Sequence, residues 1–252
     1  MGEKIRELYV VGIGPGKSDW MTLQAQTVLE ACDVIVGYTV YVNLIKQVYP
    51  NKTFLTTPMR QEIERCKLCF EKALEGKRVA MICSGDAGVY GMASPVLELS
   101  PLYPSVEVTI VPGITAALSG AALLGAPIAH DFAVISLSDL LTPMDVIMRR
   151  IHAAVEGDFV LCIYNPASKK RADYLKRVCL DIMKQTGPDR ICGFVRNIAR
   201  EGEMHEICTI KELSEKQVDM FTTVFIGNSN TKHMGDYMVT PRGYLGPDTI
   251  SG

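Results

Sequence analysis

Six turns rich in glycine, proline and small polar residues are the parts of this chain best suited to chemistry, and each follows a short apolar run. They read GIGPGKSD (12–19), SGDAGVYG (84–91), VPGITAA (111–117), YNPASKKR (164–171), VRNIAR (195–200) and IGNSNT (226–231). In open α/β sheets, ligands bind beyond the carboxyl ends of the strands. Turns of this kind from two halves of the chain indicate a ligand site in a cleft between those halves.

The first of these turns is not a standard phosphate-binding motif. The Walker A pattern needs glycine where Val11 stands, and the dinucleotide pattern needs glycine where Lys17 stands. Pro15 also lacks the N–H that a phosphate cradle would use. The turn therefore either admits the close approach of a bulky ligand or is a purely structural tight turn.

Two further turns place charge after an apolar run. The Asp86 carboxylate could pair with an amino or sulfonium cation, accept hydrogen bonds from a ribose, or serve as an N-cap. A helix predicted over 169–185 would open with three cations, which oppose the positive end of a helix dipole. An anionic ligand would offset that cost, and a solvated basic run is the alternative.

The sequence contains no recognisable nucleophile or hydrolytic metal motif. G-x-S-x-G and H-E-x-x-H are missing, and the four histidines are scattered. Cys66 and Cys69 form the one C-x-x-C, which has no second pair to complete a zinc site, so we predict no metal. The predicted helix around them has an apolar face made of Met59, Ile63, Cys66, Phe70 and Leu74. Group transfer from an activated cofactor fits these absences, because it needs positioning more than acid–base groups.

The elements that must position these turns alternate along the chain. Strands are expected at 8–14, 33–37, 78–85, 106–113, 158–165, 190–197, 203–210 and 222–229, with helices at 22–32, 59–76, 114–125, 142–157 and 169–185. Strands separated by helices predict parallel pairing with helices on the faces, whereas 190–210 predicts an antiparallel pair. The pattern restarts beyond Gly125, so we expect two α/β lobes, a mostly parallel one over 1–125 and a mixed one over 126–252.

Composition excludes several classes of protein. Among 252 residues, 26 Lys and Arg face 28 Asp and Glu, which argues against a protein that neutralises a nucleic-acid backbone. No apolar run approaches the ~20 residues of a membrane helix, and the first residues lack the pattern of a secretory signal. We therefore expect a cytoplasmic protein with neither nucleic acid nor membrane as partner.

The chain resembles the tetrapyrrole (precorrin) methylase family over essentially its whole length. The segments YVVGIGPG, SGDAGVYGMA and VPGITAALSGAALLGAPIAHDF carry the general resemblance, and TTPMRQEIERC, HDFAVISLSDLLTPMDVI, YNPASKKR and GNSNT point to the branch that acts on precorrin-3B or cobalt-factor III. The resemblance implies S-adenosyl-L-methionine-dependent methylation of carbon 17 of the tetrapyrrole in cobalamin biosynthesis, with ring contraction. It also implies a homodimer of two-lobed subunits, with the cofactor in the cleft between the lobes.

The resemblance carries over to individual residues. The implied cofactor contacts are Pro15, Gly85, Asp86, Ala87, Val89, Tyr90, Thr115, Ala116, Tyr164, Asn165, Asn197, Ile198, Asn228, Ser229 and Thr231. A polyanionic macrocycle needs a local basic patch, for which the candidates are Arg60, Lys169, Lys170, Arg171 and Arg196. Candidates for proton transfer during ring contraction are Asp19, His130, Ser136 and Asp139. A methylase acting at another ring carbon and a non-catalytic S-adenosylmethionine-binding protein remain as alternatives.

Overall fold

The computed structural model describes residues 6–168 and 172–244 and divides the chain into two compact units. The first unit ends at Ala116 and the second begins at Ala117, whereas the sequence placed the boundary after residue 125. Helix α5 (Ala116–Leu124) accounts for the difference. A methyl group added to Gly120 in this helix would lie 3.0 Å from the ring of Phe225, so α5 packs on the second unit.

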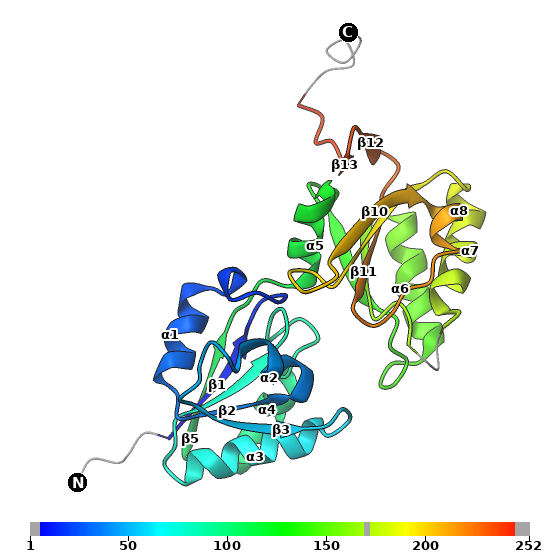
Figure 1. Cartoon of the computed structure of the whole chain (residues 1–252). Helices are drawn as coiled ribbons and strands as arrows, with labels where there is room; N and C mark the ends of the chain where they lie inside the picture. The colour runs from blue at the N-terminus through cyan, green and yellow to red at the C-terminus, as the bar shows by residue number, and fades with distance from the viewer. Residues whose placement is uncertain (1–5, 169–171, 245–252) are drawn as a thin grey trace. The chain divides into compact units, whose positions relative to one another are not determined.

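The first unit is built around a parallel sheet, four of whose strands are labelled in Figure 1. The order of the strands in this sheet is β3-β2-β4-β1-β5. Its strands are β1 (Arg6–Gly12), β2 (Val34–Tyr38), β3 (Thr53–Thr57), β4 (Val79–Cys83) and β5 (Val106–Val111). Its helices are α1 (Leu23–Ala31), α2 (Thr39–Ile45), α3 (Glu62–Leu74) and α4 (Ala93–Leu99), with 3-10 turns η1 (Ser18–Trp20) and η2 (Ser100–Leu102). Because all five strands run the same way, the turns that follow them meet at one edge of the sheet.

Alternation along the strands sends side chains to two apolar cores on opposite faces of this sheet. Met81 of β4 packs with Phe70 of α3 on one face, where α4 also lies. The neighbouring Ile82 packs with Leu29 of α1 and Ile45 of α2 on the other face. Every residue of β4 is buried, as expected of a central parallel strand covered by helices on both sides.

The second unit contains a mixed sheet with strand order β10-β9-β11-β8-β7. Its strands are β7 (Phe132–Ser136), β8 (Val160–Tyr164), β9 (Ile191–Arg196), β10 (Met204–Thr209) and β11 (Thr222–Ile226), and its further helices are α6 (Met144–Glu156), α7 (Tyr174–Thr186) and α8 (Ile210–Leu213). A small sheet joins β6 (Gly125–Ala126), β12 (Lys232–Met234) and β13 (Tyr237–Val239). β7 and β8 are parallel, whereas β11 runs antiparallel to both β8 and β9.

The predicted fold class is confirmed, including the parallel first sheet, the mixed second sheet and the antiparallel pairing of β9 with β10. Helix α7 is a correction, because it begins at Tyr174 and not at position 169. The apolar face predicted for α3 is also wrong: Cys66 and Phe70 are buried, but Met59, Ile63 and Leu74 are 45%, 46% and 40% exposed. The buried face is rotated by about one residue and consists of Arg65, Cys66, Cys69, Phe70 and Ala73.

Candidate functional site

Three of the turns singled out in the sequence are joined at the carboxyl edge of the first sheet, where β4, β1 and β5 are neighbours. Gly14 and Gly85 exchange two backbone hydrogen bonds, with N···O distances of 3.0 and 2.7 Å. The Ile13 N–H donates to the Cys83 carbonyl at 2.9 Å. The turn after β1 is thus bonded directly to the turn after β4.

The glycines of these turns are required by the packing of one backbone on another. A methyl group added to Gly113 would lie 2.1 Å from the Gly85 carbonyl oxygen, and one added to Gly12 would lie 2.7 Å from that same oxygen. At Gly14, which has φ +72°, a methyl group would lie 2.6 Å from the Trp20 carbonyl oxygen. Of the two interpretations of the GIGPG turn, the structural tight turn therefore has direct support.

Asp86 organises two of the three turns through its carboxylate. One oxygen, Oδ1, accepts the N–H groups of Gly88 at 2.8 Å and Val89 at 3.1 Å. The other, Oδ2, accepts the N–H of Gly113 at 2.8 Å and so ties the turn after β4 to the turn after β5. A carboxylate offers about four acceptor sites, so one remains for a further donor. The turn role of Asp86 is thus observed, and a contact with a ligand stays a prediction.

Strained backbone marks several of the predicted site residues. Arg60 (φ +68°), Tyr90 (+54°), Asn165 (+52°) and Asn197 (+54°) all adopt the left-handed conformation. Asparagine tolerates this region, but an arginine or tyrosine there is unusual. Such conformations persist only where the surrounding structure imposes them, and they concentrate at functional sites. Tyr90 is 57% exposed.

The edge of the second sheet at which β7, β8 and β9 end brings together five more predicted residues. Tyr164 ends β8, and its hydroxyl accepts the Ala117 N–H in the first turn of α5 at 2.6 Å. The side-chain amide of Asn165 donates to the Ser136 hydroxyl, at the end of the adjacent β7, at 2.9 Å. Asn197 and the buried Ile198 follow β9 at the same edge, because β9 runs parallel to β8 across the antiparallel β11.

The remaining predicted cofactor residues, Asn228, Ser229 and Thr231, lie at the opposite edge of this sheet. The Ser229 hydroxyl and N–H donate to the Asp158 carboxylate, at 2.6 and 2.8 Å, just before β8 begins. A five-residue strand spans roughly 17 Å, so this turn is not brought together with Tyr164 and Asn165. This turn does follow the carboxyl end of its strand, but that end lies opposite to the ends of β8 and β9, because β11 is antiparallel to both.

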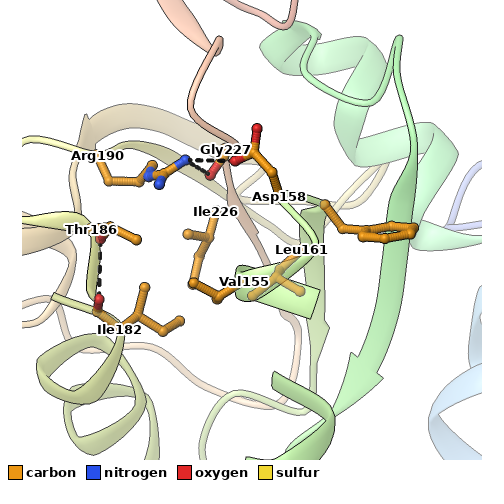
Figure 2. Close-up of a pocket in the computed structure, with 9 residues that line it drawn as sticks. Val155, Asp158, Leu161, Ile182, Thr186, Arg190, Ile226 and Gly227 are labelled. Atoms are coloured by element: carbon orange, nitrogen blue, oxygen red, sulfur yellow. Dashed lines mark hydrogen bonds and ion pairs between the residues drawn. The ribbon is translucent and has the colours of Figure 1, made fainter. Parts of the chain in front are cut away.

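A small cavity lies beside this turn (Figure 2). Its volume is about 10 Å³, room for roughly one water molecule and far below that of a nucleoside. Arg190 donates to the Gly227 carbonyl at 3.4 Å and forms an ion pair with Asp158 at 3.5 Å. Burial alone would raise the pKa of Asp158, but the Ser229 bonds and the Arg190 charge lower it. These contacts hold the turn after β11 to Asp158 before β8, and they do not form a ligand pocket.

The candidates for proton transfer belong to different elements, Asp19 to the first unit and the other three to the second. Asp19 lies in η1, where it accepts a long 3.4 Å bond from Ser18. His130 precedes β7 and contacts Asp131 at 3.4 Å, whereas Ser136 ends the same strand, so these two residues lie at opposite ends of β7. Asp139 accepts a 2.6 Å hydrogen bond from the Tyr174 hydroxyl.

The basic candidates are only partly described. Arg60 is exposed, with its N–H 3.3 Å from Glu62 Oε1, and Arg196 pairs with Asp219 at 2.8 Å. Lys169, Lys170 and Arg171 lie outside the described residues. The argument that they oppose a helix dipole is not supported, because α7 begins at Tyr174.

The C-x-x-C cysteines are buried in the core of the first unit. Burial raises the pKa of the Cys66 thiol to about 11 and raises that of Cys69 well above its usual range. Within residues 6–168 and 172–244, no group of three or more His, Cys, Asp or Glu side chains is arranged to hold a metal ion. Over the same ranges, no helix has both the length and the apolar character needed to cross a membrane.

One residue at the carboxyl edge of the first sheet is missing from the sequence-based prediction. Arg65 is only 4% exposed and bonds to the loop that carries Arg60. The signal in the sequence is an arginine one turn before the buried Cys69 on an amphipathic helix. Arg65 is not identified from the sequence, because the predicted apolar face of that helix does not include it.

Comparisons with known proteins give a consistent result. A family model described as Tetrapyrrole (Corrin/Porphyrin) Methylases matches residues 7–214. The chain is 45% identical over 238 residues to a probable cobalt-factor III C(17)-methyltransferase of Salmonella typhimurium, covering 94% of this chain and 99% of that protein. A protein of the same name from Methanocaldococcus jannaschii is 42% identical over 248 residues, covering 94% and 98%.

Solved structures agree in fold. The methyltransferase CobJ is 36% identical with a TM-score of 0.84, covering 93% of this chain and 99% of that chain. A uroporphyrin-III C-methyltransferase from Thermus thermophilus, complexed with S-adenosylhomocysteine, is 22% identical with a TM-score of 0.65, covering 88% of this chain and 92% of that chain. This second likeness concerns the fold alone.

Proposed function

The chain belongs to the tetrapyrrole (corrin/porphyrin) methylases, and from this premise we propose that it methylates carbon 17 of cobalt-factor III or precorrin-3B in cobalamin biosynthesis. The observation that carries the proposal is the 45% identity to a probable cobalt-factor III C(17)-methyltransferase, over almost the full length of both chains. CobJ, at 36% identity and a TM-score of 0.84, supports it. The family resemblance drawn from the sequence motifs is thereby confirmed.

The residues at the carboxyl edge of the first sheet fit S-adenosylmethionine, which supplies a methyl group on a sulfonium centre when bound. The segment Gly85–Tyr90 presents backbone groups in a fixed conformation, because Asp86 holds the N–H groups of Gly88 and Val89. The remaining acceptor site of Asp86 suits a ribose hydroxyl or an ammonium group. Thr115 and Ala116 follow β5 at the same edge. Contributions from the second unit, and a cleft shared by both units, stay predictions.

The proposed substrate needs positioning more than a base at the methylation step. In this step an electron-rich tetrapyrrole carbon would form a bond to the sulfonium methyl carbon while the methyl–sulfur bond breaks and S-adenosylhomocysteine leaves. The two carbons must therefore be held in line, about 3–3.5 Å apart. The absence of a nucleophile motif from the sequence agrees with such a reaction. For ring contraction, Ser136 is one predicted candidate, and its hydroxyl accepts the Asn165 side-chain amide at the edge where β7 and β8 end. The homodimer, the cytoplasmic location and the ring contraction itself remain parts of this proposal.

The direct test is turnover of the full-length protein. Incubation with S-adenosylmethionine and cobalt-factor III or precorrin-3B, under anaerobic conditions, is expected to add one methyl group by mass and to shift the visible spectrum as the macrocycle contracts. NMR of the product made with ¹³C-methyl donor then gives the ring position. A methyl group on another carbon would reassign the chain within the family, and tight donor binding without turnover would indicate a non-catalytic protein.

The basic-patch part of the proposal has its own test. The double variant Lys170→Ala/Arg171→Ala is expected to bind the tetrapyrrole more weakly while S-adenosylhomocysteine affinity is unchanged. Unchanged tetrapyrrole affinity would remove these two residues from the proposed substrate site.

A further inference from the structure

Arg65 is a buried cation without an anionic partner. Its side chain is 4% exposed, yet no carboxylate lies within 4.0 Å of its guanidinium among the residues that the structure describes. Its acceptors are all neutral: Nε donates to Thr57 Oγ1 at 2.8 Å, Nη2 to the Pro58 carbonyl at 3.0 Å, and Nη1 to Met92 Sδ at 3.8 Å. The third contact is a weak one, because a thioether is a poor acceptor.

This arrangement is unfavourable by itself. A buried charge normally requires a paired counter-charge, because removing a charge from water without one is strongly unfavourable. Arg65 also lies in the first turn of α3, where the helix dipole opposes a cation. The neutral hydrogen bonds solvate the guanidinium only in part. A guanidinium carries five N–H groups, so the three bonds leave one on Nη1 and one on Nη2 for a further acceptor.

The position of Arg65 suggests what that acceptor is. Thr57 ends β3 and Pro58 follows it, so the guanidinium lies at the carboxyl edge of the parallel sheet, where α/β proteins bind ligands. Met92 closes the loop after β4, and its N–H bonds to Cys83 Sγ at 3.3 Å. Arg65 thus lies between the loop carrying the strained Arg60 and the loop carrying Asp86, both of which belong to the proposed site.

We propose that the Arg65 guanidinium is the counter-charge for a carboxylate of a ligand bound at this edge of the first unit. The inference rests on the proposed function, which supplies two carboxylate-bearing ligands: the tetrapyrrole with its acidic side chains, and the methionine moiety of S-adenosylmethionine. Arginine suits this task because its planar fork matches a carboxylate and it stays protonated at any working pH. Binding satisfies the two remaining N–H groups and neutralises the buried charge.

Two variants of Arg65 separate the effect of its positive charge from the effect of its hydrogen bonds to the neighbouring loops. Arg65→Gln keeps hydrogen-bonding capacity without charge, and Arg65→Lys keeps the charge without the planar fork. Arg78→Gln is the matched control, because Arg78 precedes β4 at the amino edge of the same sheet and pairs with Glu7 at 2.6 Å. Affinity is measured by calorimetry for S-adenosylhomocysteine, and by quenching of the single Trp20 for uroporphyrin I, a polycarboxylate tetrapyrrole probe.

Arg65→Gln is expected to raise the Kd of one of the two probes about tenfold or more, the effect of losing one charge-assisted hydrogen bond. Arg65→Lys, which keeps the charge but loses the planar fork, is expected to raise that Kd by less than Arg65→Gln does, and Arg78→Gln is expected to leave both affinities unchanged. The probe that responds identifies the source of the carboxylate. Thr57→Val removes the acceptor of the Nε hydrogen bond but leaves the charge of Arg65 in place. This variant is expected to keep the affinity of the wild type, and it can be measured even if an Arg65 variant fails to fold.

Two results would overturn the inference. One is unchanged affinity of Arg65→Gln for both probes. The other is an equal loss of affinity in Arg65→Gln and Arg65→Lys, which would indicate that Arg65 holds the neighbouring loops in place and does not act as a counter-charge. Failure of the proposed function is distinguishable, because it appears as absence of turnover in the wild-type protein irrespective of the Arg65 variants.

Discussion

Gly113→Ala tests whether the three turns at the carboxyl edge of the first sheet depend on bare backbone contact. The added methyl group would lie 2.1 Å from the Gly85 carbonyl oxygen and 2.7 Å from the Gly12 carbonyl oxygen. Carbon and oxygen need more than 3 Å, so the backbones must separate by about an ångström. Neither obstacle is a side chain that could rotate away.

The cost follows from what that separation breaks. The Gly85 carbonyl accepts the Gly14 N–H at 3.0 Å, and the Gly113 N–H donates to Asp86 at 2.8 Å. Overpacking typically costs about 1–3 kcal/mol, and each hydrogen bond lost adds roughly 0.5–1.5 kcal/mol. We expect Gly113→Ala to lower the free energy of unfolding of the first unit by about 3 kcal/mol, the upper part of the range for single substitutions.

Hydrogen exchange of the amides in β1, β4 and β5 is the suitable assay, because a two-unit chain need not unfold in one step. A loss of about 3 kcal/mol corresponds to roughly 100-fold faster exchange through unfolding. Gly88→Ala is the matched control: it lies in the neighbouring loop, and its added methyl group would meet only Asp86 Oδ1, at 3.3 Å. Exchange in Gly113→Ala within threefold of wild type would refute the packing argument.

Three further predictions concern other named contacts. Asp86→Asn replaces one acceptor oxygen by a donor that faces an N–H group. We therefore expect the free energy of unfolding to fall by about 1–3 kcal/mol, and S-adenosylhomocysteine to bind about tenfold more weakly by calorimetry. Unchanged values for both would contradict the role of Asp86 in the turns. Burial raises the pKa of the Cys83 and Cys162 thiols to about 12. Thiol reagents at pH 8 are therefore expected to react slowly with these cysteines in the native protein and fast in denaturant. Rapid labelling of the native protein would show that solvent reaches the two cores. Asp158 has a folded pKa below its unfolded one, so its stabilisation is present above the unfolded pKa and is lost as the pH falls through the folded pKa. Asp158→Asn, which suits φ +56°, is therefore expected to destabilise the protein at pH 7 in chemical unfolding, and to destabilise it less as the pH falls through the lowered folded pKa of Asp158. An equal loss at every pH would contradict this linkage.

Periodicity located most of the long elements, but it missed α2, β3 and α4. The α2 segment, TVYVNLI, is short and rich in β-branched and aromatic residues that favour strands. Its helical form depends on packing, since Val42 and Ile45 enter the core formed with Ile35 and Leu29. Local propensity carries no record of such contacts.

The sequence alone determined the family, the α/β class, the parallel first sheet and the turns that follow its strands, because these depend on local spacing of apolar residues and on motifs. Tertiary structure decided which turns share an edge. The antiparallel course of β11 moves Asn228, Ser229 and Thr231 away from Tyr164 and Asn165, and strand direction is a property of pairing between distant segments. Likewise, the buried and unpaired charge of Arg65 exists only where α3 packs beside Thr57 and Met92. Whether a charged side chain is buried, and whether a counter-charge lies beside it, depends on how distant elements pack together. The sequence of one segment therefore does not predict either property.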